Sequence, residues 1–170
     1  MQARSSGKTE ANSYKKLYAK LKITKDTDHT LTPKNLLVRA QLHFKNGYFD
    51  LSLIDIAHVL QRDPAFIDAY YLQSQILDSK GDAVEAVKCL LTALVVSDLS
   101  TTNRVVMERL KSYSILSIQM ALNALPAEDH HFLMKQHGMA ALLQVKHNEL
   151  PADEFNLTNE LVIPIAINFC

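Results

Sequence analysis

Four histidines are the side chains of this sequence that come nearest to a metal-binding set. They are His130, His131, His137 and His147, in the last third of the chain. Neighbouring positions on a helix point about 100° apart, so His130 and His131 do not face the same ion. No carboxylate or thiol lies at a metal-ligand spacing from them. We therefore expect histidines exposed on helix faces and no metal site.

Cysteine chemistry is the second possibility. Cys89 stands beside Leu90 and Leu91, where a cysteine is usually an inert small hydrophobe and not a nucleophile. Cys170 is the only other cysteine, so the sequence has neither a disulfide framework nor a four-thiolate zinc site. The four glycines are scattered singly and form no phosphate-binding loop. We expect a protein of a reducing compartment that is not an enzyme and binds no cofactor.

The composition is that of one soluble domain, with 170 residues, 48% hydrophobic and 21% charged. Residues 1–45 hold ten basic and three acidic side chains, whereas residues 46–170 hold eight and fifteen, so the whole chain has no net charge. It therefore lacks an overall positive field for nucleic acid or an anionic membrane. No apolar run reaches the eighteen residues of a membrane span, and residues 1–16 lack a secretory signal's apolar core. We expect a cytoplasmic or nuclear protein whose partner is neither a membrane nor nucleic acid.

Helices must position whatever these side chains do, because the sequence has only four glycines and five prolines and no tryptophan. Residues 1–32 form a basic segment with a short amphipathic helix, in which Tyr14, Leu17 and Leu21 recur at spacings of three and four. Thr32 before Pro33 predicts the start of the next helix, with threonine as its cap and proline in its first turn.

Residues 33–98 resemble themselves when shifted by 34 positions, a period that indicates stacked helical hairpins. Gly47 and Gly81 can take the positive φ that a helix end needs, and Pro64 cannot continue a helix. The segment resembles two tetratricopeptide repeats, although Arg39 and Gln73 stand where that family usually has leucine. The fold class implied is all-α, a helical hairpin solenoid of the tetratricopeptide kind. The matched pairs are Leu36 with Tyr70, Ala40 with Ser74, Gly47 with Gly81, Ser52 with Ala86, Ile56 with Leu90 and Leu60 with Leu94.

Beyond Asp98 the period fails, and residues 99–150 are expected to be capping helices. The apolar pattern predicts one long helix from Arg104 to Leu125. A second helix is predicted to start at Pro126, with acidic residues in its first turn, and to end at about Asn148. Residues 151–170 form a short tail with an apolar end.

The first helices of stacked hairpins line a concave groove. The resemblance to the tetratricopeptide family implies a non-catalytic adaptor or scaffold that binds a partner protein there, through a peptide or a helix. Family members that bind the acidic carboxyl ends of chaperones use lysine and asparagine where this sequence has Leu37, Gln41 and Leu72, so that clamp is not matched. The implied groove residues are Lys34, Leu37, Gln41, Phe44, Lys45, Asp68, Tyr71, Gln75 and Asp78.

Two other functions stay open from the sequence. The chain could be the substrate-recruiting or assembly part of a larger ubiquitin ligase or similar complex, with the apolar tail leading into a further domain. It could also be an RNA-associated scaffold that uses the basic amino-terminal segment, and salt-dependent retention on RNA would then distinguish it.

Overall fold

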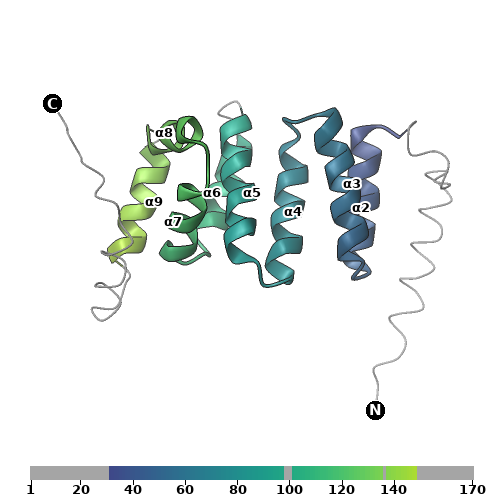
Figure 1. Cartoon of the computed structure of the whole chain (residues 1–170), viewed down its shortest axis with the longest axis horizontal. Helices are drawn as coiled ribbons and strands as arrows, with labels where there is room; N and C mark the ends of the chain where they lie inside the picture. Colours follow the sequence, from purple (N-terminus) through teal and green to yellow (C-terminus); the bar gives the residue numbers. More distant parts are fainter. Residues whose placement is uncertain (1–30, 98–100, 136, 149–170) are drawn as a thin grey trace, which may run out of the picture. The chain divides into compact units, whose positions relative to one another are not determined.

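Eight α-helices and no strand make up the residues that the computed structural model describes, which are 31–97, 101–135 and 137–148 (Figure 1). The expected all-α fold class is confirmed for these residues. The helix predicted near the amino terminus and the tail at 151–170 lie outside them. The chain divides into two compact units between Ile76 and Leu77. The helices are α2 (Pro33–Lys45), α3 (Phe49–Arg62), α4 (Ile67–Ser79), α5 (Ala83–Val96), α6 (Thr101–Leu110), α7 (Ile115–Asn123), α8 (Ala127–Lys135) and α9 (His137–Asn148).

The bounds of the first four helices repeat with the period found in the sequence. Both α2 and α4 have 13 residues and both α3 and α5 have 14, and each bound of the first pair returns 34 residues later. The predicted positive φ is confirmed at the same phase of both copies, 77° at Gly47 and 88° at Gly81. A residue with a Cβ rarely adopts this conformation, so glycine is the residue that ends α2 and α4 in this way.

The start of α2 also follows the prediction. The Thr32 hydroxyl accepts a hydrogen bond from the backbone N–H of Asn35 at 3.3 Å, and Pro33 is the first helical residue. Proline is favoured there because its missing N–H would have no partner inside the helix. At the other end of the hairpin, α3 ends at Arg62, two residues before Pro64.

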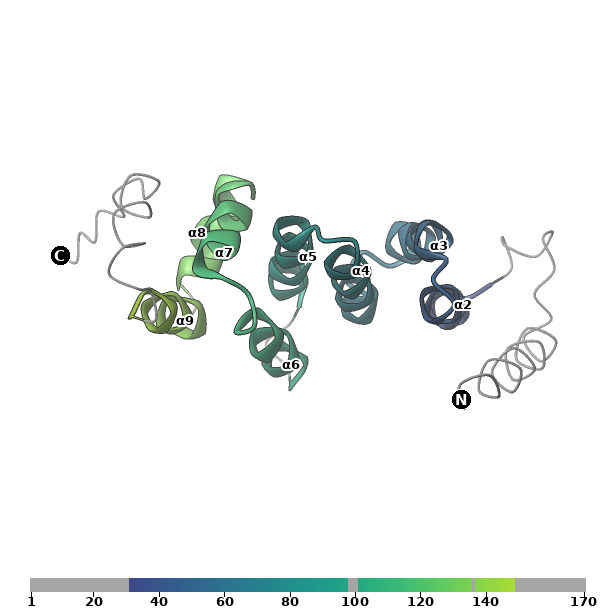
Figure 2. The same cartoon turned by 90° about the horizontal axis from the view of Figure 1, so that it is seen from below.

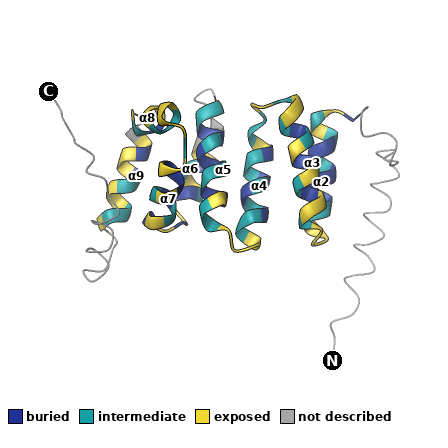
Figure 3. Cartoon of the chain, viewed as in Figure 1, coloured by how far each residue is buried: buried dark blue, intermediate teal, exposed yellow. Residues whose placement is uncertain are grey.

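The core of the first unit lies where α2 packs against α3. Leu36 and Ala40 on α2 and Ile56 on α3 have no exposed surface, and Figure 3 shows dark blue residues on both helices. The helices approach closely at two small residues, where the Ser52 hydroxyl donates to the Ala40 carbonyl oxygen at 2.7 Å. The same core includes Leu31, Leu37, Val59, Ala69, Leu72 and Ile76.

The second unit is built around α5, which contacts α6, α7 and α8 (Figure 2). The sequence of α5, AVEAVKCLLTALVV, is apolar around most of its circumference, and such a helix is buried on several sides. Its side chains Ala86, Val87, Leu90, Leu91 and Ala93 have no exposed surface. Helix α9 completes the unit against α7 and α8.

The predicted single helix over 104–125 is wrong, because the chain turns between α6 and α7. The Ser112 hydroxyl donates to the Arg109 carbonyl oxygen at 2.7 Å. The Ser114 hydroxyl accepts from the backbone N–H of Ser117 at 3.1 Å and caps α7. Serine side chains compete with the backbone of a helix for its hydrogen bonds and favour helix starts. These two serines are the sequence signal that the prediction missed.

The predicted helix over 126–148 is likewise two helices, α8 and α9. Gly138 is the second residue of α9, and glycine is the poorest helix former after proline, so a helix that ends before it loses little. The break lets α9 contact α7 as well as α8.

Candidate functional site

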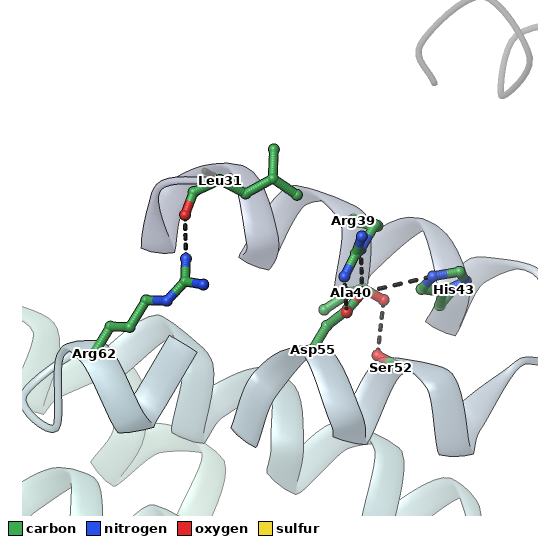
Figure 4. Close-up of polar contacts among 7 residues, drawn as sticks. All are labelled: Leu31, Arg39, Ala40, His43, Ser52, Asp55 and Arg62. Carbon is green, nitrogen blue, oxygen red and sulfur yellow. Dashed lines mark hydrogen bonds and ion pairs between the residues drawn. The ribbon is translucent and has the colours of Figure 1, made fainter. Parts of the chain in front are cut away.

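A buried ionic cluster joins α2 to α3 in the first unit (Figure 4). Arg39 donates from Nε and Nη2 to the two carboxylate oxygens of Asp55, at 2.9 and 2.6 Å. The side chains are 9% and 4% exposed. His43, one turn after Arg39, places Nε2 3.5 Å from the same carboxylate. Arg39, which stands where the family has leucine, is thus a charged core residue whose partner comes from the facing helix.

The surroundings of His43 favour its neutral form. Burial lowers the pKa of this imidazole below 6.5, against the opposing effect of Asp55, and Arg39 adds to the lowering. The hydroxyl drawn beside the cluster in Figure 4 belongs to Ser52, and it donates to the Ala40 carbonyl oxygen. Catalysis by a histidine and carboxylate pair needs a nucleophile that hydrogen-bonds the histidine. The contacts of this cluster therefore describe a structural connection between two helices.

A second contact between the same helices lies at the start of α2. The Arg62 guanidinium, in the last turn of α3, donates to the Leu31 carbonyl oxygen (Figure 4). Leu31 is itself buried in the core of the first unit. The chain that enters α2 is therefore held to the end of α3.

A surface pocket of about 590 Å³ opens between α2 and α4, wholly inside the first unit. Helix α2 contributes residues spaced by three and four, which lie on one helix face, and α4 does the same. The lining combines two amides, two aromatic rings, one basic and one acidic side chain, and one leucine. The lining residues are Gln41, Phe44 and Lys45 from α2 and Asp68, Tyr71, Leu72 and Gln75 from α4.

Six of the nine groove residues implied by the sequence line this pocket. Leu72 lines it too, although the sequence analysis did not include it among them; it is 4% exposed and supplies an apolar wall. Its spacing was the available signal, because it lies four residues after Asp68 and therefore on the same helix face.

The other three predicted groove residues lie elsewhere. Lys34 is an exposed residue in the first turn of α2 and does not line the pocket. Leu37 is 6% exposed and belongs to the core, because α2 buries Leu36, Leu37 and Ala40 together.

Asp78 lies in the second unit, where its carboxylate accepts a hydrogen bond from Arg109 on α6. The Arg109 guanidinium also lies 5.7 Å from the centre of the Tyr113 ring. Burial raises the pKa of Tyr113, with the Asp78 charge adding to the rise. Asp78 therefore holds the end of α4 to α6 and does not contribute to the pocket.

The candidate catalytic and metal-binding residues come together in no site within the described residues. No three histidine, cysteine, aspartate or glutamate side chains there are placed to hold a metal ion. The Cys89 thiol is half-buried on α5, and burial, with a smaller effect from Glu85, raises its pKa to about 12. A nucleophilic cysteine needs a lowered pKa, so the surroundings of Cys89 are those of a packing residue.

Comparison with known proteins gives one partial likeness. A stretch of 62 residues is 34% identical to ALBINO3-like protein 3, mitochondrial, from Arabidopsis thaliana. The match covers 36% of this chain and only 11% of the Arabidopsis protein. No family model and no solved structure matches the chain.

Proposed function

We propose that this protein is a non-catalytic adaptor of the tetratricopeptide kind, which binds an extended segment of a partner protein in the pocket between α2 and α4. In this proposal α2 to α5 are two repeats, and α6 to α9 cover the apolar face that the second repeat would otherwise expose. Terminal elements of stacked repeats commonly have that role.

One observation carries the proposal. Gln41 and Gln75 are separated by the repeat period of 34 residues, and both line the same pocket. Equivalent positions of two successive first helices therefore present an amide to one concavity. A side-chain amide both donates and accepts hydrogen bonds, so it can pair with the N–H and C=O groups of an extended backbone.

The rest of the lining supports the same ligand class. Phe44 and Tyr71 offer aromatic surface, and Leu72 offers an aliphatic wall. Interface anchors are enriched in aromatic residues, because large rigid rings bury much area at a low entropy cost. A segment with exposed backbone groups and an apolar side chain fits such a pocket better than a metal ion or a phosphate does.

The experiment is affinity capture with the full chain, followed by binding measurements on the captured partner. Tyr71→Ala combined with Gln41→Ala should weaken binding by about 2 kcal/mol or more, because both side chains line the pocket. The helical circular dichroism signal should stay, because Gln41 is exposed and Tyr71 is half-buried. The matched control is Tyr48→Ala with Gln61→Ala, the same residue types at exposed positions away from the pocket.

Two outcomes would overturn the proposal. The first is that the pocket double variant binds as tightly as the control double variant. The second is that a chelator, or replacement of His130 and His131, abolishes binding. The printed name of the Arabidopsis protein places that protein in mitochondria. Imaging of the tagged full chain therefore decides between that organelle and the cytoplasm or nucleus that the sequence analysis predicts.

A further inference from the structure

We propose that the pocket selects an extended segment carrying a basic and an acidic residue four positions apart, with an apolar residue midway between them. The basic residue lies at the Asp68 end of the pocket and the acidic residue at the Lys45 end. This inference rests on the proposed function, and it adds the chemistry of the partner.

The two charged lining residues lie at opposite ends of the pocket. Helices α2 and α4 run in the same direction, because α3 reverses the chain between them (Figure 1). Lys45 is the last residue of α2, whereas Asp68 is the second residue of α4. Both helices have 13 residues, so at a rise of 1.5 Å per residue these two positions are separated by about 16 Å along the helix axes.

This separation sets the spacing in the ligand. An extended chain rises about 3.3 Å per residue, and its side chains i, i+2 and i+4 face the same side. Four residues therefore span about 13 Å, and the long flexible side chain of a lysine covers the rest of the distance. A basic residue at i and an acidic residue at i+4, or the reverse order for the opposite chain direction, place opposite charges against Asp68 and Lys45.

The residue midway must suit the wall between the two charged ends. Tyr71 and Leu72 follow Asp68 on α4 and offer apolar surface to a side chain at i+2. Gln41 and Gln75 pair with backbone groups, which every peptide has, so they contribute affinity without selecting a sequence. Charge pairs at partly exposed positions contribute mainly to selectivity, and the charged residues therefore distinguish one ligand from another.

The test is selection from a phage-displayed library of random twelve-residue peptides against the full chain, followed by binding of synthetic five-residue peptides with blocked ends. The peptides are Lys-x-Phe-x-Glu, its reverse Glu-x-Phe-x-Lys, Lys-x-Phe-x-Lys, Glu-x-Phe-x-Glu and the uncharged Gln-x-Phe-x-Gln. Each is measured against the wild-type chain, Lys45→Glu and Asp68→Lys. The first substitution makes both ends of the pocket acidic, and the second makes both ends basic.

The wild type should enrich and bind a peptide of mixed charge roughly tenfold better than the peptides with two like charges. Lys45→Glu should instead prefer Lys-x-Phe-x-Lys, and Asp68→Lys should prefer Glu-x-Phe-x-Glu. These preferences hold for either chain direction of the peptide. They should shrink in high salt, because exposed charge pairs are screened.

The control is Lys135→Glu with Asp50→Lys, which reverses a charge in the last turn of α8 and another in the first turn of α3, outside the pocket. It should keep the wild-type preference. Wild-type binding that is equal for charged and uncharged peptides, yet lost on Tyr71→Ala with Gln41→Ala, would overturn this inference and leave the proposed function standing. Absence of any selected peptide that depends on Tyr71 and Gln41 would overturn both.

Discussion

Arg39 and Asp55 form a two-point ion pair inside the α2–α3 hairpin, with separations of 2.9 and 2.6 Å and both residues buried. The 34-residue period relates them to Gln73 and Cys89 in the second repeat, which carry no charge at neutral pH. The pair is therefore specific to the first hairpin, although both hairpins have helices of the same lengths.

Removing one partner of this pair should destabilise the protein strongly. Asp55→Asn leaves the buried Arg39 guanidinium without its counter-charge, so we expect the free energy of unfolding to fall by about 3–5 kcal/mol in a urea titration. Replacing both, Arg39→Leu with Asp55→Leu, should restore stability to within about 1 kcal/mol, because an apolar pair of suitable volume can replace a buried ion pair. Asp50→Asn, at an exposed position of α3, is the control. A loss below about 1 kcal/mol for Asp55→Asn would contradict the importance of the pair.

Gly81→Val should destabilise the protein by about 1–3 kcal/mol, because Gly81 has a φ of 88° that a β-branched residue adopts only under strain. A Cβ at this position would meet nothing within 4 Å, so the whole cost comes from the backbone. Gly81→Asn should recover most of the loss, since asparagine tolerates this conformation better.

Gly138→Ala is the contrasting glycine substitution. Gly138 lies in α9, and an added Cβ would make an ordinary 3.5 Å contact with Met107. We expect it to be neutral or to stabilise by up to about 1 kcal/mol, because alanine favours a helix over glycine. Equal effects of Gly81→Val and Gly138→Ala in thermal or urea unfolding would argue against backbone strain at Gly81.

Stability should depend on pH through His43. Burial lowers the pKa of His43 from 6.5, so below that pH the unfolded chain binds more protons than the folded chain. The contribution is therefore fully present above about pH 6.5 and is lost as the pH falls through the lowered folded-state value. His43→Gln should make the fall in unfolding free energy on the acidic side shallower, by at most about 1.4 kcal/mol per pH unit. The same substitution at His130, on α8 and outside this cluster, is the comparison, and identical pH slopes for the two variants would contradict the assignment.

Cys89 should react slowly with iodoacetamide while the protein is folded. Its pKa of about 12, against an ordinary value of 9.0, lowers the thiolate fraction at pH 8 by about a thousandfold. The experiment uses a Cys170→Ser background, so that only Cys89 is labelled, and follows alkylation by mass spectrometry. Labelling should become fast in urea. Fast labelling of the folded chain would show that Cys89 has a reactive environment after all.

Local signals in the sequence were sufficient for the first four helices. The period of 34 residues, the Thr32 cap with Pro33, and the positive φ at Gly47 and Gly81 all depend on neighbouring residues and the backbone, so they could be predicted without knowing the packing. The helix face that carries Gln41 and Gln75 followed in the same way from the repeat. The turn before α7 was missed although its signal is local, because an apolar pattern outweighed two serines.

Tertiary structure decided which polar residues find partners. Arg39 and Asp55 are 16 residues apart in sequence, and Asp78 and Arg109 are 31 apart. Nothing in the periodicity of one helix says which charge on another helix will face it. Helical spacing placed Leu37 and Asp78 beside the groove, whereas packing puts Leu37 in the core and pairs Asp78 with α6. Long-range pairing depends on how helices approach one another, and that is a property of the whole core and not of any single segment.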